Sequence, residues 1–210
     1  TSTAGNTSIG WASGKQLVTG DYNIFMGYSA GGTTTDVDYT VIIGFQAGIS
    51  NMTAAADGTI AIGYQSGYAI TSGAGNIAIG YEAGYAITSG NHNVAIGYEA
   101  LETEDTGGGT VAIGYHAAKA QNGNGKNVSI GYQASKNGHE AIGDSAGFNS
   151  TTVTGNTLLG SSAGSAITTG DYSVAIGYQA LVSTNSGGSN IAIGRLAGAN
   201  NTSANGNMYI

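Results

Sequence analysis

Residues 76–97 read NIAIGYEAGYAITSGNHNVAIG, which is one complete repeat followed by the start of the next. Each repeat contains a step of apolar residues that ends in glycine, and we take this corner glycine as position zero. The corner glycines are Gly10, Gly27, Gly44, Gly63, Gly80, Gly97, Gly114, Gly131, Gly143, Gly160, Gly177 and Gly194. Nine of their eleven spacings are 17 residues. A fixed period of this kind is the sequence signature of a repeat architecture.

The residues before the corner glycine alternate in size. Ile or Val stands three residues before it, a small residue follows, and Ile stands directly before it, as in Val94-Ala95-Ile96. This alternation predicts a short β-strand, with two large side chains on one face and a small one on the other. Stacking each strand on its copy at about 4.8 Å would give a parallel sheet along the molecule. We expect the Ile and Val columns to form its continuous core.

The polar and glycine positions predict how the chain turns between strands. Glycine at position zero allows a sharp corner with a positive φ. Asn commonly opens the strand, as at Asn76 and Asn93. Its side chain is expected to form a hydrogen-bonded ladder at the other corner. The absence of proline fits this scheme, because every coil must donate hydrogen bonds to its neighbour.

The predicted fold class is therefore all-β, a parallel β-solenoid of about twelve 17-residue coils. Residues 1–210 form a single repeat domain, with irregular coils near 45–63 and 131–143. The first is a 19-residue repeat, which is expected to bulge near Asn51–Asp57. The part of each repeat after the corner, rich in Thr, Ser and Gly, leads back to the next strand, and we call it the return segment. The short repeat from Gly131 to Gly143 lacks about five residues of this segment, so the solenoid must narrow, kink or change face there. The chain ends inside a repeat, and we expect it to be a fragment of a longer fibre.

Composition excludes several classes of function. The chain has five Lys plus Arg and a net charge of −7, too few cations to neutralise a run of nucleic-acid phosphates. No apolar run is long enough to insert across a membrane. Without cysteine there is neither a disulfide scaffold nor a zinc–thiolate site. Charged residues make up 8%, where a globular domain has about 25%. This favours a regular backbone stacked on itself.

The Asn-x-Val-Ala-Ile-Gly motif resembles the head repeats of trimeric autotransporter adhesins, the YadA-like β-roll. The fuller unit at 80–97 also resembles repeats of phage tail fibres and of trimeric bacterial surface fibres. The resemblance covers nearly the whole chain, although the 17-residue period departs from the shorter YadA unit. It implies a left-handed coil, a homotrimer, and an extracellular fibre on a virion or bacterial cell surface. It also implies a structural or adhesive role in attachment to a host or prey cell.

An aromatic column is the best sequence candidate for ligand binding. Aromatic faces bind sugars, so a cell-surface glycan or another surface receptor is the expected partner. Stacking between coils, or burial between subunits, is the structural alternative. The column breaks at Asp144, Ser161 and Arg195. The predicted ladder comprises Trp11, Tyr28, Phe45, Tyr64, Tyr81, Tyr98, Tyr115, Tyr132 and Tyr178.

Columns of alanine and serine leave two interpretations open. Small side chains permit close packing of one solenoid on another, or they only fill a narrow coil interior. The two columns comprise Ala61, Ala78, Ala95 and Ala112, and Ala30, Ala47, Ala83, Ala100, Ala117 and Ala134.

No pattern predicts catalysis, a cofactor or a metal site, and we expect a protein that is not an enzyme. The three histidines fall at unrelated repeat positions, so surface histidines are expected rather than a metal triad. One acidic cluster could bind Ca²⁺, but a solvated acidic loop is the preferred interpretation. The alternatives to a fibre are a monomeric ice-binding solenoid and a glycan-degrading tailspike. The residues concerned are His92, His116 and His139, and Glu99, Glu102, Glu104 and Asp105.

Overall fold

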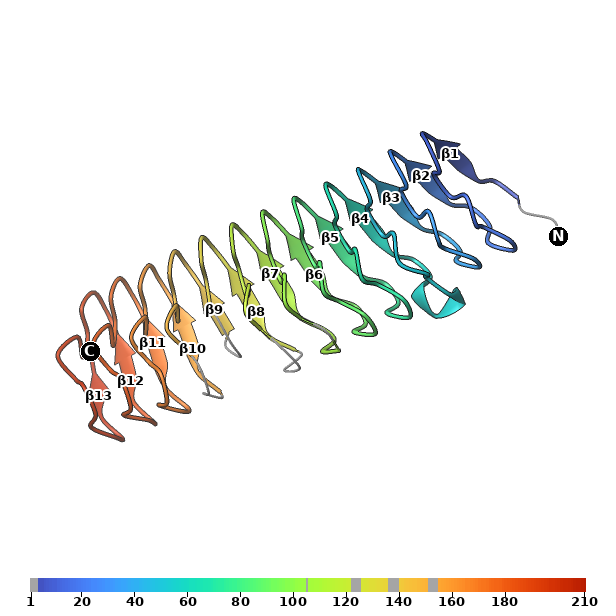
Figure 1. Cartoon of the computed structure of the whole chain (residues 1–210). Coiled ribbons are helices and arrows are strands. Elements are labelled where there is room, and N and C mark those ends of the chain that lie inside the picture. Colours follow the sequence, from blue (N-terminus) through green and yellow to red (C-terminus); the bar gives the residue numbers. More distant parts are fainter. Residues whose placement is uncertain (1–3, 105, 122–125, 136–139, 151–154) are drawn as a thin grey trace.

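The computed structural model describes residues 4–104, 106–121, 126–135, 140–150 and 155–210. These residues form one elongated rod whose two termini lie at opposite ends (Figure 1). Thirteen strands lie side by side in a single parallel sheet, in chain order. They are β1 (Thr7–Ile9), β2 (Ile24–Met26), β3 (Val41–Ile43), β4 (Ile60–Ile62), β5 (Ile77–Ile79), β6 (Val94–Ile96), β7 (Val111–Ile113), β8 (Val128–Ile130), β9 (Glu140–Ile142), β10 (Thr157–Leu159), β11 (Val174–Ile176), β12 (Ile191–Ile193) and β13 (Met208–Tyr209).

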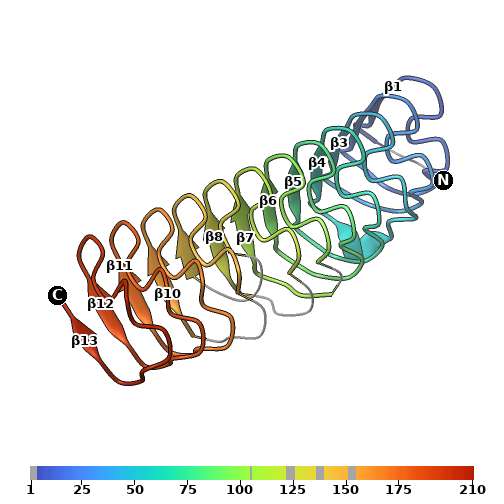
Figure 2. The same cartoon turned by 60° about the vertical axis from the view of Figure 1, so that its left-hand side comes forward.

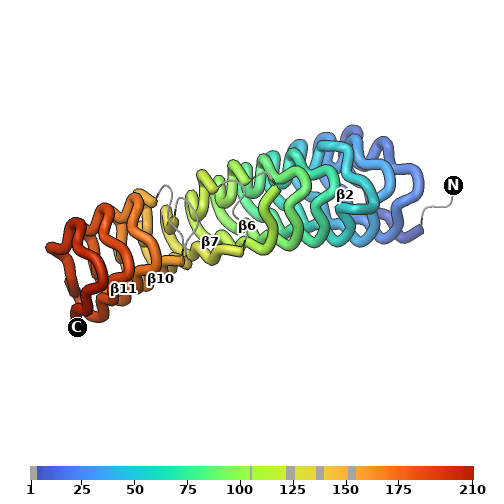
Figure 3. The backbone as a smooth tube through the Cα atoms, turned by 90° about the horizontal axis from the view of Figure 1, so that it is seen from below, coloured from blue at the N-terminus to red at the C-terminus, as the bar shows by residue number. Residues whose placement is uncertain are grey.

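Each coil contributes one strand, and neighbouring strands pair repeat position to repeat position. Ile77 is opposite Val94, and Ile79 is opposite Ile96. Figure 2 shows the coils following one another like the turns of a spring, and Figure 3 shows the same succession from below. The prediction of an all-β parallel solenoid is confirmed, because the 17-residue period places equivalent residues in register.

The two irregular repeats do not interrupt this sheet. The 19-residue repeat forms a one-turn 3-10 helix, η1 (Ala54–Ala56), while β3 and β4 keep their register. Across the short repeat, Ser129 is still opposite Ala141, and Ile130 is opposite Ile142. The longer and the shorter repeat therefore differ from the others outside the strands, and the register of the sheet is unchanged. No helix in the described ranges is long and apolar enough to cross a membrane.

The core lies on the opposite face of the strand from the one we predicted. In β6, Ala95 is fully buried, whereas Val94 and Ile96 on either side of it are partly exposed. The same alternation holds in every strand from β2 to β12. The prediction that Ile and Val columns form the core is wrong. The coil interior is so narrow at the strand that only the small middle side chain generally fits, and the large ones turn outward.

The alanine columns consequently fill the interior, which is the second of the two interpretations. All ten predicted members have 0% exposure, so none of them can contact another solenoid. Larger buried side chains come instead from the return segment, such as Ile70 and Ile87. Phe25 is a large residue at the buried middle position of its strand. In that coil the fourth residue after the corner glycine is Gly31, which leaves room for the ring. A Cβ on Gly31 would lie 2.5 Å from the Phe25 ring. A large side chain at one interior position of a coil thus requires a small residue at another.

The corner glycines have the positive φ that the sequence predicts, between 123° and 140°. A Cβ on any of those from Gly10 to Gly177 would lie 2.1–2.6 Å from backbone of the next corner glycine. Real Cβ atoms do not approach backbone this closely, so both the dihedral angle and the space demand glycine.

The predicted asparagine ladder is also present. The Asn93 side chain donates from Nδ2 to the Gly107 carbonyl at 2.9 Å. Its Oδ1 accepts from the Thr110 amide, also at 2.9 Å. Asn76 makes the equivalent pair of bonds one coil earlier, to Gly90 and to the amide of Asn93. Each buried amide side chain therefore joins the backbone of consecutive coils at the corner before the strand.

Candidate functional site

The aromatic ladder is continuous over the first eight of its nine predicted rings. Each ring from Trp11 to Tyr132 stacks on the next one. Centroid distances are 4.7–5.4 Å and interplanar angles 5–15°. Tyr178 lies beyond the break at Asp144 and Ser161, where its ring faces the Arg195 guanidinium at 5.7 Å. Stacking between coils thus covers both faces of every ring from Tyr28 to Tyr115.

The ladder rings remain exposed at their edges, at 40–65%. Each ladder ring follows the last residue of a strand by two positions, as Tyr98 follows Ile96. The ladder therefore borders the outward-facing Ile and Val side chains. We call this combined surface, the ladder plus the first and third residues of each strand, the outer apolar face. Its strand residues are partly or fully exposed from β1 to β12. The arrangement leaves an apolar stripe from Trp11 to Tyr132, which is unusual for the surface of a soluble monomer. Beyond Tyr132 the polar residues Glu140, Asp144, Thr157 and Ser161 interrupt it.

Two shorter aromatic columns lie at other corners, and the sequence prediction did not include them. Tyr22 stacks on Tyr39 with centroids 5.5 Å apart, and Tyr68 stacks on Tyr85 at 4.9 Å. Both pairs are 17 residues apart, so a search for aromatic residues at the repeat period, rather than only after the corner glycine, would have found them. Burial raises the pKa of Tyr85.

A cluster of four titratable groups lies beside the ladder on two neighbouring coils. Glu99 accepts from His116 Nε2 at 2.9 Å and also pairs with Lys119. Lys119 Nζ lies 3.1 Å from Glu102 as well. The Lys119 ammonium thus compensates part of the negative charge of the two carboxylates.

The cluster shifts the pKa of its members in opposite directions. Partial burial of Glu99 opposes ionisation, but hydrogen bonds from Lys119 and Tyr98 outweigh it and lower the pKa of Glu99. Partial burial also opposes the charged form of Lys119, while its bonds to Glu99 and Glu102 raise its pKa. The hydrogen bond to Glu99 raises the pKa of the Tyr98 hydroxyl, as Glu82 does for Tyr81.

We expect this cluster to make stability depend on pH through Glu99. A lowered folded-state pKa adds stability above about 4.3, the usual Glu value, and that stability is lost as the pH falls through the folded pKa. Glu99→Gln should therefore cost about 0.2–1 kcal/mol at pH 7 and less at pH 3, because protonation of Glu99 weakens its ion pair. Urea titrations at both pH values measure the difference.

Glu82→Gln is the matched control for this prediction. Glu82 holds the same repeat position one coil earlier and has no ion pair among the described residues. A cost of Glu99→Gln that is the same at pH 3 as at pH 7 would contradict the role of charge and point to packing.

The predicted acidic loop and histidines do not form a common site. Glu104 is fully buried and accepts from the Gly107 amide at 2.7 Å, so the prediction of a solvated acidic loop is wrong for this residue. Glu99 and Glu102 are tied to Lys119. His92 lies over Gly75 at a corner, while His139 and Asp105 lie outside the described residues. In the part of the chain that the structure describes, no three acidic or histidine side chains group to hold a metal ion.

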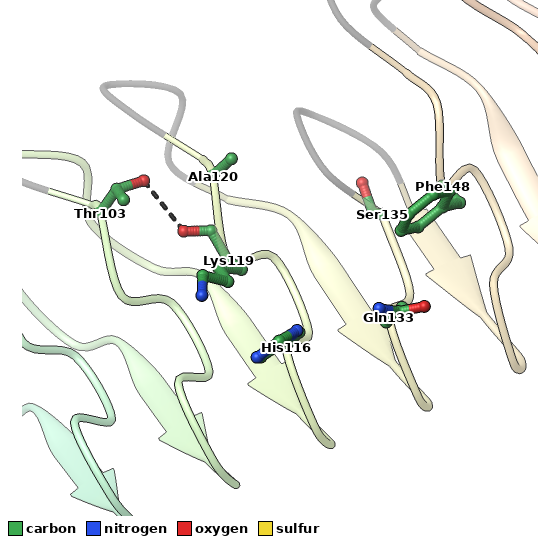
Figure 4. A pocket seen from close by; sticks show the side chains of 7 residues that line it. All are labelled: Thr103, His116, Lys119, Ala120, Gln133, Ser135 and Phe148. Atoms are coloured by element: carbon green, nitrogen blue, oxygen red, sulfur yellow. Dashed lines mark hydrogen bonds between the residues drawn. The ribbon is translucent and has the colours of Figure 1, made fainter.

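A pocket of about 250 Å³ opens on the return side where the short repeat follows a full one. Figure 4 shows its walls. His116 and Lys119 come from the coil before the short repeat, Gln133 and Ser135 from the short repeat itself, and Phe148 from the coil after it. Thr103 and Ala120 complete the lining. The sequence predicted an irregularity here but not a pocket.

The interior also changes at this point. The described core forms two clusters of buried apolar residues, one ending at Ala118 and the other beginning at Ala141. Between them lie buried Ala134 and two buried serines, Ser129 and Ser135, whose hydroxyls have no hydrogen-bond partner within the described ranges. Ser129 therefore stands in the strand position where β5, β6 and β7 bury alanine.

The chain was compared with protein-family models, with characterised proteins and with solved structures. None of them matches it. Its function must therefore be inferred from the geometry of the rod.

Proposed function

We propose that this protein is a structural and adhesive segment of an extracellular trimeric fibre, which attaches a phage or a bacterium to its target cell. It acts as a repeat-built rod and not as an enzyme. The outer apolar face carries this proposal, because it runs along the rod and faces solvent in a single chain. The resemblance of the repeat to adhesin heads and phage tail fibres supports the attachment role.

The area of the face supports an interface between chains. With about 150–250 Å² per aromatic side chain, nine ladder rings at 40–65% exposure leave on the order of 800 Å² of aromatic surface. About 800 Å² per partner is what a stable interface of standard size buries. The outward Ile and Val side chains add to this area. The face is therefore large enough to hold copies of the chain together.

The shape of the face favours further copies of the same chain as its occupants. A partner must match a stripe that repeats at every coil from Trp11 to Tyr132, and another rod with the same repeat has that spacing. Three parallel copies around one axis form a closed assembly in which every face is covered. The number three comes from the resemblance to trimeric fibres. In this arrangement we assign the aromatic ladder to the contact between subunits.

Light scattering behind size exclusion tests this proposal directly. We expect a native mass of about three times 20.7 kDa. In a parallel trimer, Ile79→Lys would bring three ammonium groups together at one height on an apolar contact. We therefore expect this variant to run as a 20.7 kDa monomer with an unchanged circular dichroism spectrum.

Ser89→Lys is the control, because it adds the same charge to an exposed position on the return side of the same coil. It should leave the mass of the trimer unchanged. A wild-type chain that stays monomeric at every concentration, or an Ile79→Lys variant that stays trimeric, would contradict the proposed role of the outer apolar face.

A further inference from the structure

We infer that the corner around Tyr39 binds a quaternary ammonium group, such as the choline group of a cell-surface molecule. This inference goes beyond the proposed fibre and does not depend on the number of chains in it. The corner comes two residues before β3, whereas the rings of the aromatic ladder follow the strands. Figure 1 shows η1, which directly precedes Asp57 of this corner, on the edge of the rod opposite the corners that follow the strands.

Tyr39 holds a repeat position at which the fold itself requires only glycine. Its φ is 57°, a left-handed conformation that bulky residues rarely adopt. Its side chain is 65% exposed, so burial does not account for a tyrosine here. At six other corners the same position is glycine, with φ between 62° and 77°: Gly5, Gly58, Gly75, Gly109, Gly155 and Gly206. Tyr39 is therefore available to contact a partner.

One face of the Tyr39 ring is open. Its other face stacks on Tyr22, with centroids 5.5 Å apart and an interplanar angle of 8°. Rings at this position lie over the preceding coil, since a Cβ on Gly5 would be 2.6 Å from the Tyr22 ring. A ring at position 58 would cover Tyr39 in the same way. Residue 58 is glycine, however, and a Cβ there would meet no atom within 4 Å. The place of one ring is thus free for a ligand.

Carboxylates lie beside this open face. Asp57 Oδ1 accepts from the Asp38 amide at 2.8 Å, so the Asp57 carboxylate reaches back to the residue next to Tyr39. Asp38 Oδ1 accepts from the Asp21 amide at 2.6 Å in the same way. Each of these bonds uses one oxygen and leaves the negative charge in place. None of the three aspartates forms an ion pair with another described residue.

The charge of this part of the rod favours a cation. Residues 1–62 contain four aspartates and one lysine, so their side chains sum to −3. Residues 1–3, the part of this stretch outside the described ranges, have no charged side chain. An ammonium group is attracted both by the carboxylates and by the negative face of an aromatic ring. The ring and the charges therefore favour the same class of ligand, and a phosphate or carboxylate would be repelled.

A quaternary ammonium suits this corner better than a primary one. Its methyl groups provide apolar surface that packs on an exposed ring, and aromatic side chains recognise choline in this way. A primary ammonium, such as that of lysine, is compact and strongly hydrated. It would have to give up more of its hydration in order to contact the ring.

Two substitutions remove the site with little risk to the fold. Tyr39→Gly introduces the residue that six other corners carry at this position. Asp57→Asn removes the charge but can keep the hydrogen bond, because Asn91 Oδ1 accepts from the Ala74 amide at the equivalent position. The control is His92→Gly, which changes the position equivalent to Tyr39 on a coil away from this corner.

The experiment is saturation-transfer NMR on the intact chain, with choline, its uncharged carbon analogue dimethylbutanol, and methylammonium. We expect choline to bind with a dissociation constant in the millimolar range and the other two to bind more weakly. Tyr39→Gly should weaken choline binding about 2–30-fold, the range of a cation–π contact. Asp57→Asn should weaken it about fivefold, the effect of one charge at close range in water. His92→Gly should bind choline as the wild type does.

Several results would overturn the inference. Equal binding of choline and dimethylbutanol would show that charge plays no part, and tighter binding of methylammonium would assign the corner to a lysine-like ligand. Choline binding that survives Tyr39→Gly, or no choline binding at all, would also contradict it. Light scattering on the same samples keeps the two proposals apart. A trimer that binds no choline rejects the corner alone, whereas a monomer that binds choline rejects the trimer alone.

Discussion

Gly97→Ala is expected to destabilise the protein by about 4–5 kcal/mol, a loss that few single substitutions reach. Gly97 has a φ of 133°, where residues with a side chain are strained. The added Cβ would also lie 2.4 Å from the Gly114 carbonyl oxygen. Neither backbone can easily move aside, because the Gly114 amide donates to the Ile96 carbonyl at 2.8 Å. Urea unfolding followed by circular dichroism measures the loss.

Gly58→Ala is the control for the dihedral angle alone. Gly58 has a φ of 73°, and a Cβ there would meet no atom within 4 Å. We expect this variant to lose only about 1–2 kcal/mol, the cost of a left-handed conformation. Because a solenoid can unfold in part, hydrogen exchange at the amides of β6 and β7 should locate the damage. Equal losses in the two variants would show that the close approach between coils is unimportant.

Asn93→Leu should cost about 2–5 kcal/mol, because it leaves two buried backbone groups without partners. These groups are the Gly107 carbonyl and the Thr110 amide, which the Asn93 side chain joins. Asn93 itself is fully buried, so water does not replace the lost bonds. Thermal unfolding of wild type and variant at pH 7 tests this expectation.

Asn93→Asp makes the same prediction dependent on pH. A protonated carboxyl can donate to Gly107 and accept from Thr110, but a carboxylate can only accept and is buried. The introduced group should therefore have a raised pKa in the folded state. The variant should be most stable below about pH 3.9, the unfolded value, and lose stability as the pH rises to the folded pKa.

Asn91→Asp is the matched control. Asn91 Oδ1 accepts from the Ala74 amide at an exposed corner, where Asp21 and Asp38 accept in the same way on earlier coils. A carboxylate is thus already tolerated at this position, and the variant should stay close to wild type at every pH. An Asn93→Asp variant that behaves like Asn91→Asp would contradict the role of the asparagine ladder.

Much of this fold could be predicted because the repeat period determines which residues lie next to each other in neighbouring coils. The spacing of the corner glycines predicts one strand per coil, the parallel register of the strands and the positive φ at each corner. The asparagine ladder follows from the hydrogen-bonding capacity of a side chain that recurs before each strand. These features depend on sequence distance alone, so no knowledge of the width of the coil was needed.

The direction of the strand residues could not be predicted in the same way. Alternation such as Val94-Ala95-Ile96 shows that two faces differ, but it does not show which one is inside. The usual preference for burying the larger residues led to the wrong answer, because the coil is too narrow at the strand. Glu104 was misassigned for a related reason. It occupies the interior position held by Ile87 one coil earlier, which the local acidic pattern conceals.

The pocket was beyond sequence reasoning as well. The length of the short repeat predicted an irregularity, but the site depends on how residues of successive coils meet around it. Lys119 and Phe148 hold the same repeat position, but they belong to coils on either side of the short repeat. The contact between these coils is therefore visible only in three dimensions.

The joint between β8 and β9 has a mechanical consequence for a fibre. Two residue pairs join these strands, where three join β7 to β8. Two buried serine hydroxyls beside the joint, of Ser129 and Ser135, also lack a hydrogen-bond partner among the described residues. We therefore expect a fibre pulled by fluid flow to yield first at this joint. The coils on either side could then extend and refold separately, so that a sudden load is absorbed before the attachment fails.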